Sequence, residues 1–214
     1  AGVGVDWLEE FAEVLPPPNL GLGLSYPVRA LESDFMLDEI TDAAGRISGL
    51  LAAAKQYTQM DRAPLQKFDV HEGLDATLTM LAHKLGDDIE IDRDYDRTLP
   101  QISAFPGELN QVWTNLIDNA ADAMERRGKL TVRTRQERDD RLMVEIGDTG
   151  PGVPDEIRGR VFEPFFTTKE VGAGTGLGLD IAWQIVVGRH GGEIRLESEP
   201  GNTQFQVILP LEQA

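Results

Sequence analysis

The sequence contains no cysteine, which excludes disulfide bonds, thiolate metal sites and a cysteine nucleophile. Positive charge is also scarce: 20 Lys and Arg residues face 37 Asp and Glu residues, for a formal net charge of −17. Because binding to the phosphate backbone of DNA or RNA needs clustered Lys and Arg side chains, we expect no nucleic-acid partner. The sequence has neither an apolar run long enough to span a membrane nor a secretory signal pattern. We therefore expect a cytoplasmic location and no membrane contact within this chain.

The composition that remains is typical of a soluble globular protein. The 214 residues are 41% hydrophobic and 27% charged, which suits one large domain or two small ones. The chain starts without Met, so we expect it to be a piece of a longer protein. Its first 30 residues combine a short amphipathic stretch with the proline run at 16–18 and with Pro27. Because proline is excluded from helix interiors, this part is expected to be a helical connector.

A long helix is predicted from about Leu31 to Met60. Its apolar residues recur at alternating steps of four and three, which is typical of packing against another helix; they are Met36, Ile40, Ala43, Ile47, Leu50, Ala54 and Tyr57. Whether that other helix belongs to the same domain or to a second copy stays open at this point. Beyond residue 65 the pattern becomes α/β. It predicts helices over 70–85, 105–127 (ended by Gly128) and 178–189, and strands over 89–95, 130–135, 142–147, 193–197 and 204–209.

Three polar residues share one face of the predicted helix 105–127. Asn115 and Asn119 are four residues apart, and Asp122 follows three residues later. Side-chain amides are poor choices in mid-helix because they compete for backbone hydrogen bonds. Two of them stacked on one face suggest oxygen ligands for a hard cation such as Mg²⁺. A solvated polar face is the alternative.

Three further motifs follow in order. Asp148 comes directly after a predicted strand and could accept a hydrogen bond from an exocyclic amine, while Gly150 and Gly152 would allow a flat ring to approach; an ordinary turn is the alternative. Next comes Phe-Glu-Pro-Phe-Phe-Thr-Thr-Lys at 162–169. Its three phenylalanines around a proline predict an apolar anchor, followed by donors and one cation from Thr-Thr-Lys; a buried aromatic loop is the alternative. The last is Gly-Ala-Gly-Thr-Gly-Leu-Gly-Leu at 172–179. Glycine-rich backbone before a helix presents free N–H groups to phosphate.

Together, in this order and spacing, these motifs resemble the N, G1, F and G2 boxes of the GHKL ATP-binding fold. The match is to the catalytic domain of sensor histidine kinases, in particular the nitrogen-sensor-like branch, and it covers roughly Phe68 to Leu209. The resemblance implies an α/β fold of the Bergerat type, a two-layer α+β sandwich preceded by a helical segment with a long bundle helix. It also implies three regions: a helical insert over 1–30, the second helix of a dimerisation bundle over 31–64, and a catalytic ATP-binding domain over 65–214.

The resemblance assigns ATP and Mg²⁺ as cofactors. It implies that Asn119 is the principal Mg²⁺ ligand, helped by Asn115, and that Asp148 accepts from the adenine amino group. The segment Lys169–Thr175 would form a short flap, with Lys169 able to reach the terminal phosphate. Including the residues on the same helix face and in the same motifs, the expected nucleotide-binding set is Asn115, Asn119, Asp122, Asp148, Gly150, Gly152, Thr167, Thr168, Lys169, Gly174, Thr175, Gly176, Leu177 and Gly178.

The resemblance further implies a kinase that transfers the ATP γ-phosphoryl group to a histidine and then to a response regulator. The expected acceptor box is missing: His71, His83 and His190 are the only histidines, and none has the right neighbours or position. We expect the acceptor to lie outside this chain, and homodimerisation through the bundle helices of the full-length protein. A GHKL-type ATPase and a non-catalytic nucleotide-sensing dimerisation module are the alternatives. Because GHKL ATPases place a catalytic Glu four residues before the metal Asn, Asn115 counts against hydrolysis.

Overall fold

The structure is a computed structural model that describes Met36, residues 65–169 and residues 174–212. The predicted connector over 1–30 and most of the predicted bundle helix over 31–64 therefore lie outside the described residues. Met36 itself is helical and exposed. None of the described helices is long and apolar enough to span a bilayer.

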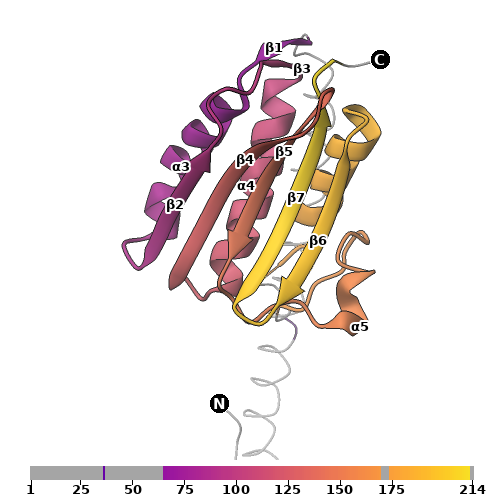
Figure 1. Cartoon of the computed structure of the whole chain (residues 1–214). Coiled ribbons are helices and arrows are strands. Elements are labelled where there is room, and N and C mark those ends of the chain that lie inside the picture. Colours follow the sequence, from indigo (N-terminus) through magenta and orange to yellow (C-terminus); the bar gives the residue numbers. More distant parts are fainter. Residues whose placement is uncertain (1–35, 37–64, 170–173, 213–214) are drawn as a thin grey trace, which may run out of the picture. The chain divides into compact units, whose positions relative to one another are not determined.

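A five-stranded mixed sheet forms one layer of the described part (Figure 1). Its order is β2 (Ile89–Tyr95), β4 (Gly128–Arg138), β5 (Arg141–Asp148), β7 (Asn202–Pro210) and β6 (Glu193–Glu199). The pairing of β2 with β4 is parallel, and the other three pairings are antiparallel. All five strands lie where the sequence pattern predicts them, although most extend one to three residues further. The predicted two-layer α/β sandwich is thus confirmed for the catalytic part.

Helices cover one face of this sheet and form the second layer (Figure 1). They are α3 (Val70–Leu85), α4 (Pro106–Ala123) and α6 (Gly178–Trp183), which continues as the π-helix η2 (Gln184–Arg189). The helix α4 is central because its apolar residues recur at helical spacing and are fully or nearly buried; they are Leu109, Val112, Trp113, Leu116, Ile117, Ala120 and Ala121. They pack against inward-facing residues of the sheet such as Leu130, Val132, Val144 and Ile146.

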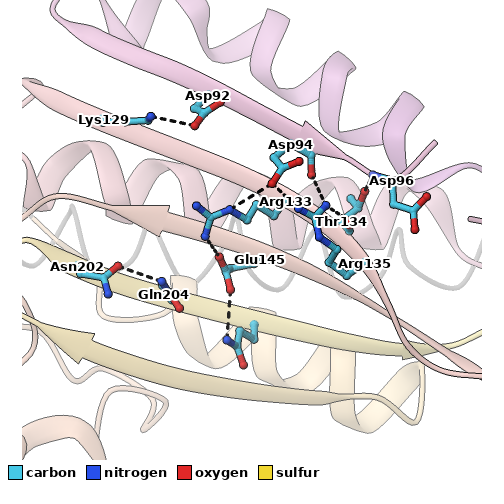
Figure 2. A network of polar contacts seen from close by, with 11 residues as sticks. Asp92, Asp94, Asp96, Lys129, Arg133, Thr134, Arg135, Glu145, Asn202 and Gln204 are labelled. Atoms are coloured by element: carbon cyan, nitrogen blue, oxygen red, sulfur yellow. Dashed lines mark hydrogen bonds and ion pairs between the residues drawn. The ribbon is translucent and has the colours of Figure 1, made fainter. Parts of the chain in front are cut away.

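The opposite face of the sheet carries charged side chains that pair across neighbouring strands (Figure 2). Arg133 lies between Asp94 of β2 and Glu145 of β5, and donates to Glu145 at 2.8 Å. Gln206 of β7 donates to the other oxygen of Glu145 at 3.2 Å. Asp92, Asp94 and Glu145 thus each have a partner on a neighbouring strand.

The end of α4 differs from the sequence-based prediction. The helix ends at Ala123, four residues before the predicted Arg127, because Glu125 and Arg126 adopt left-handed backbone conformations, with φ of 51° and 61°. The Arg126 amide then bonds back to the Ala121 carbonyl at 2.9 Å. Gly128 does not cap the helix as predicted, but opens β4 with φ of 132°.

Three short elements were not predicted. The strands β1 (Gln66–Phe68) and β3 (Ile102–Ala104) form a small antiparallel sheet, and α5 (Asp155–Arg158) is a single helical turn. Elements of three or four residues are too short to show a hydrophobic period, which is why the pattern missed them.

Candidate nucleotide-binding site

The C-terminal half of α4 is where the four predicted motifs meet. The side chain of Asn115 bonds to the first residue of α6, and Asp122 pairs with Lys169 of the aromatic motif. Gly150, after β5, lies against the end of the same helix, since a Cβ placed there would approach the Ala123 carbonyl oxygen to 3.2 Å. Segments up to 63 residues apart in sequence thus meet at the last two turns of α4.

The side-chain amide of Asn115 joins two of these motifs. Its Nδ2 donates to the carbonyl oxygen of Gly178 at 2.9 Å, and its Oδ1 accepts from Gln111 at 2.9 Å. Gln111 was not among the predicted site residues, although it lies four residues before Asn115 on the same helix face. The ladder of amides at 111, 115 and 119 was the signal that could have identified it.

The carboxylate of Asp148 is the most deeply buried acid of the predicted set, with 5% of the residue exposed. Its Oδ1 accepts from the Gly150 amide at 2.8 Å, and Oδ2 has no hydrogen-bond partner among the described residues. Burial raises the pKa of Asp148, and the Gly150 hydrogen bond offsets that only in part. A buried acceptor with one free oxygen is suited to recognise an amine.

Glycine is required at both positions after Asp148. At Gly150 a Cβ would lie 2.7 Å from Asp148 Oδ1, which is closer than a carbon can approach. Gly152 has φ of 86°, and a Cβ there would lie 3.0 Å from the backbone of Glu199. The turn after β5 is therefore packed tightly onto the turn between β6 and β7, where the Gly201 amide donates to the Gly150 carbonyl at 2.8 Å.

The aromatic motif is anchored by one phenylalanine rather than three. Phe162 packs edge-to-face on Phe205 of β7, with ring centroids 6.3 Å apart. Phe165 is 58% exposed and has φ of 65°, whereas Phe166 lies under the guanidinium of Arg160. The prediction of a three-phenylalanine anchor is corrected accordingly. Thr167, Thr168 and Lys169 follow as exposed residues.

The glycine-rich segment touches the aromatic motif. Gly176 has φ of 66°, and a Cβ there would collide with the backbone of Phe165. At Gly174 a Cβ would lie 3.0 Å from both Thr167 Oγ1 and Lys169 Cδ. Thr175 is exposed, Leu177 is buried, and the helical run 178–189 starts directly after them. The middle of the predicted flap, 170–173, lies outside the described residues.

The side-chain oxygens of this site suit a divalent cation that binds together with a nucleotide. No group of three His, Asp or Glu side chains that could hold a metal ion occurs among residues 65–169 and 174–212. Asn115 and Asn119 supply carboxamide oxygens, which suit Mg²⁺, but the Asn115 oxygen already accepts from Gln111. Asn119 therefore has the freer amide, and phosphate oxygens would have to complete the coordination.

A family model described as "Histidine kinase-, DNA gyrase B-, and HSP90-like ATPase" matches residues 106–213, about half of the chain. The match starts with α4 and includes all four motifs. The chain belongs to this family.

Relatives narrow the placement within the histidine kinase-, gyrase B- and HSP90-like family. The chain is 37% identical over 186 residues to the sensor kinase CckA of Brucella abortus and 34% identical over 188 residues to the sensory histidine kinase/phosphatase NtrB of Rhodobacter capsulatus. These alignments cover 80% and 82% of this chain but only 20% and 52% of the relatives. The chain thus spans about half or less of their length. The predicted resemblance to the nitrogen-sensor-like branch is confirmed.

Solved structures agree with this placement. The catalytic domain of the histidine kinase ThkA is 28% identical, with a TM-score of 0.63, and the match covers 70% of this chain and 99% of that domain. A complex of ThkA with the response regulator protein TrrA matches 95% of this chain and 64% of the kinase, at 20% identity and a TM-score of 0.65, which shows a shared fold. The catalytic part of this chain therefore has the fold of a histidine kinase ATP-binding catalytic domain.

Two of the three histidines are structural within this histidine kinase domain. His71 is 2% exposed, and its ring nitrogens contact Asp69 at 2.8 Å and Thr134 at 2.9 Å. His190 is equally buried: its Nε2 accepts from the Phe105 amide, while Nδ1 donates to the Ile185 carbonyl. Burial lowers the pKa of His190, which favours the neutral ring. Neither ring has a free nitrogen for phosphorylation, which leaves only His83, an exposed residue in the last turn of α3.

Thr149 was absent from the predicted set of site residues. Thr149 lies between Asp148 and Gly150, and its Oγ1 accepts from the Lys129 amide at 3.0 Å. The same hydroxyl group lies 3.6 Å from Met124 Sδ, just beyond the end of α4. It therefore fixes the turn after β5 to both the helix and the neighbouring strand. No spacing rule links these residues, so the sequence offered no signal for this contact.

Proposed function

We propose that this chain binds Mg²⁺·ATP between α4, the turn after β5 and the start of α6. We further propose that it transfers the γ-phosphoryl group to a histidine on a bundle helix that is missing from this chain. A response regulator would then receive the phosphoryl group, and the full-length protein would work as a cytoplasmic homodimer. The observation that supports this most strongly is the convergence of all four motifs on the C-terminal half of α4.

Adenine recognition is assigned to Asp148. Its free Oδ2 would accept from the exocyclic amine, while Gly150 and Gly152 let the purine ring approach the backbone. Accepting a hydrogen bond favours the ionised form, so the ligand would offset the desolvation that raises the pKa of this carboxyl group. Guanine presents a carbonyl oxygen at the same position of the ring, and that oxygen would repel the carboxylate.

Phosphate binding is assigned to the glycine-rich segment and the aromatic motif. The backbone amides of residues 174–178 precede a helical run, where N–H groups and the helix dipole favour an anion. Thr167 and Thr168 add hydroxyl groups, and Lys169 adds a positive charge. These local donors matter because the chain as a whole carries a net charge of −17.

Asn119, with Asn115 beside it, would hold the Mg²⁺ ion, which neutralises phosphate charge when bound. The chain's own contribution to transfer is positioning, because phosphoryl transfer needs little more than alignment and charge stabilisation. Asn115 lies where an ATPase of this fold would carry its general base, and its amide is engaged with Gly178 and Gln111. This arrangement favours transfer to a side chain over transfer to water.

The test mixes the chain with γ-labelled ATP and a separately produced bundle segment that carries the acceptor histidine of a relative. Label on that histidine, stable to alkali and labile to acid, is the expected result. Release of free phosphate at a higher rate than labelling would instead indicate an ATPase. Nucleotide binding with neither product would indicate a nucleotide-sensing module.

A further inference from the structure

Lys169 and Asp122 form the closest ion pair within the candidate site. Lys169 Nζ lies 2.6 Å from Asp122 Oδ2, and both side chains are about one-third exposed, at 36% and 31%. The pair links the aromatic motif to α4, which are 47 residues apart in sequence. Arg126 is a second and more distant partner, with Nη2 3.6 Å from Asp122 Oδ1.

The rest of the Lys169 side chain is also held. Its Cδ lies 3.0 Å from where a Cβ would stand at Gly174, so the alkyl stem runs along the face of that glycine. The Lys169 amide donates to Thr167 Oγ1 at 3.2 Å, which fixes the backbone at the base of the side chain. The ammonium group is therefore directed toward α4 by contacts at its base, along its stem and at its tip.

A carboxylate beside a triphosphate needs a physical reason. Asp122 lies three residues after Asn119, on the same face of α4, and an unpaired negative charge there would repel the phosphates. Pairing with Lys169 cancels that charge. It also holds a flexible side chain with several rotatable bonds in one place, so less rotamer entropy is lost when a phosphate binds.

We propose that Asp122 is a positioning residue that holds the Lys169 ammonium group at the place of the ATP terminal phosphate, without contacting the nucleotide itself. This inference rests on the proposed function. It differs from the sequence-based expectation that Asp122 belongs to the nucleotide contacts. Because the ammonium group serves the last phosphate, the loss of Asp122 should weaken nucleoside triphosphates more than diphosphates.

The experiment measures the affinity of the full 214-residue chain for Mg²⁺·ADP and for a Mg²⁺-bound non-hydrolysable ATP analogue by calorimetry. Asp122→Asn should weaken the ATP analogue by about tenfold and ADP by less than about twofold, a size that fits the loss of one charge-assisted hydrogen bond. In a Lys169→Met background, Asp122→Asn should change neither affinity further. Asp118→Asn is the matched control, since Asp118 lies on α4 like Asp122, but its Oδ2 pairs outside the site with Lys84 of α3, at 2.7 Å.

Each remaining outcome overturns the inference. Equal weakening of both nucleotides, with a lower melting temperature, would mean a merely structural ion pair. An equal effect of Asp122→Asn with and without Lys169 would mean that Asp122 contacts the ligand or the metal. Tighter binding of the ATP analogue would mean that Asp122 competes with phosphate for the lysine. If the unaltered chain binds neither nucleotide, the proposed function fails, independently of Asp122.

Discussion

The side chain of Asn115 donates a hydrogen bond to the backbone carbonyl of Gly178 at 2.9 Å, and so connects the middle of α4 to the first residue of α6. This contact gives Asn115 a role that its position in the predicted metal-binding motif does not reveal. The amide fixes the distance between the helix that would hold the ion and the backbone that would hold the phosphates. A side chain without an N–H donor could not form it.

Asn115→Ala should therefore loosen the junction between these helices. It removes both the Gly178 and the Gln111 hydrogen bonds, and we expect the free energy of unfolding to fall by about 1–2 kcal/mol. Gln111→Ala removes only one of the two and should cost about half as much. Urea denaturation of the two variants measures the difference. Equal losses would mean that the bond to Gly178 contributes nothing.

Asn119→Ala should weaken Mg²⁺-dependent ATP binding while leaving the fold intact. The residue is only partly buried and lies outside the hydrophobic core, so the melting temperature should stay close to that of the unaltered chain. Losing a partner that only supports a metal ligand typically weakens metal binding by roughly 10-fold to 100-fold, and losing a direct ligand should weaken it at least as much. Calorimetry in Mg²⁺ and again in EDTA separates the metal-dependent affinity for ATP from the metal-free affinity. An unchanged affinity in Mg²⁺ would remove Asn119 from the site.

Asp148→Asn should separate stability from recognition. The folded-state pKa of Asp148 lies above its unfolded value near 3.8, so this group favours the folded state below that pH, and the advantage is lost as the pH rises through the folded pKa. At pH 7 this buried acid stabilises the folded state less than it does at low pH, whereas the uncharged amide accepts from Gly150 at any pH. We expect an equal or higher melting temperature at pH 7.

The same substitution should weaken ATP by roughly 10-fold to 100-fold, because the amide can present a donor to the adenine amine. The unaltered chain should bind GTP more weakly than ATP, and the substitution should reduce the affinity for GTP much less. A competition titration with the two nucleotides gives the ratio. Equal losses for ATP and GTP would contradict the assignment of Asp148 to the purine.

Gly176→Ala should destabilise the start of α6. The position has φ of 66°, which costs an L-residue about 1–2 kcal/mol, and the added Cβ would collide with the Phe165 backbone. Gly159→Ala is the control, since Gly159 has φ of −68° and nothing lies within 4 Å of the added atom. Thermal unfolding should show a clear loss for the first variant and almost none for the second. Similar losses of thermal stability in the two variants would mean that the backbone around Gly176 adjusts freely to the added Cβ.

The sequence predicted those parts of the fold whose side chains repeat with a clear period. The apolar spacing of Leu109, Val112 and Trp113 defines α4, and the alternation of Leu130 and Val132 defines β4. The end of α4 was mispredicted because Glu125 and Arg126 adopt positive φ, which is normally a glycine conformation. Gly128 looked like the cap, but it is required at the start of β4, where a Cβ would lie 2.5 Å from Thr149 Oγ1.

The sequence grouped the candidate site residues but could not give their contacts. The order of the four motifs placed Asn115, Asp148 and Gly176 in one candidate site, and their roles in nucleotide binding stay predictions. The bonds of Asn115 to Gly178 and of Lys169 to Asp122 join residues 63 and 47 positions apart. Such pairs depend on how α4 packs against loops, and no local pattern in the sequence encodes that packing.

The most direct test of this account is a crystal structure of the chain with Mg²⁺ and a non-hydrolysable ATP analogue. We predict the adenine amine on Asp148 Oδ2, the metal on Asn119 and the triphosphate along residues 174–178. A nucleotide bound elsewhere would contradict it. So would a crystal grown with saturating analogue in which these residues contact one another and leave no room for the nucleotide.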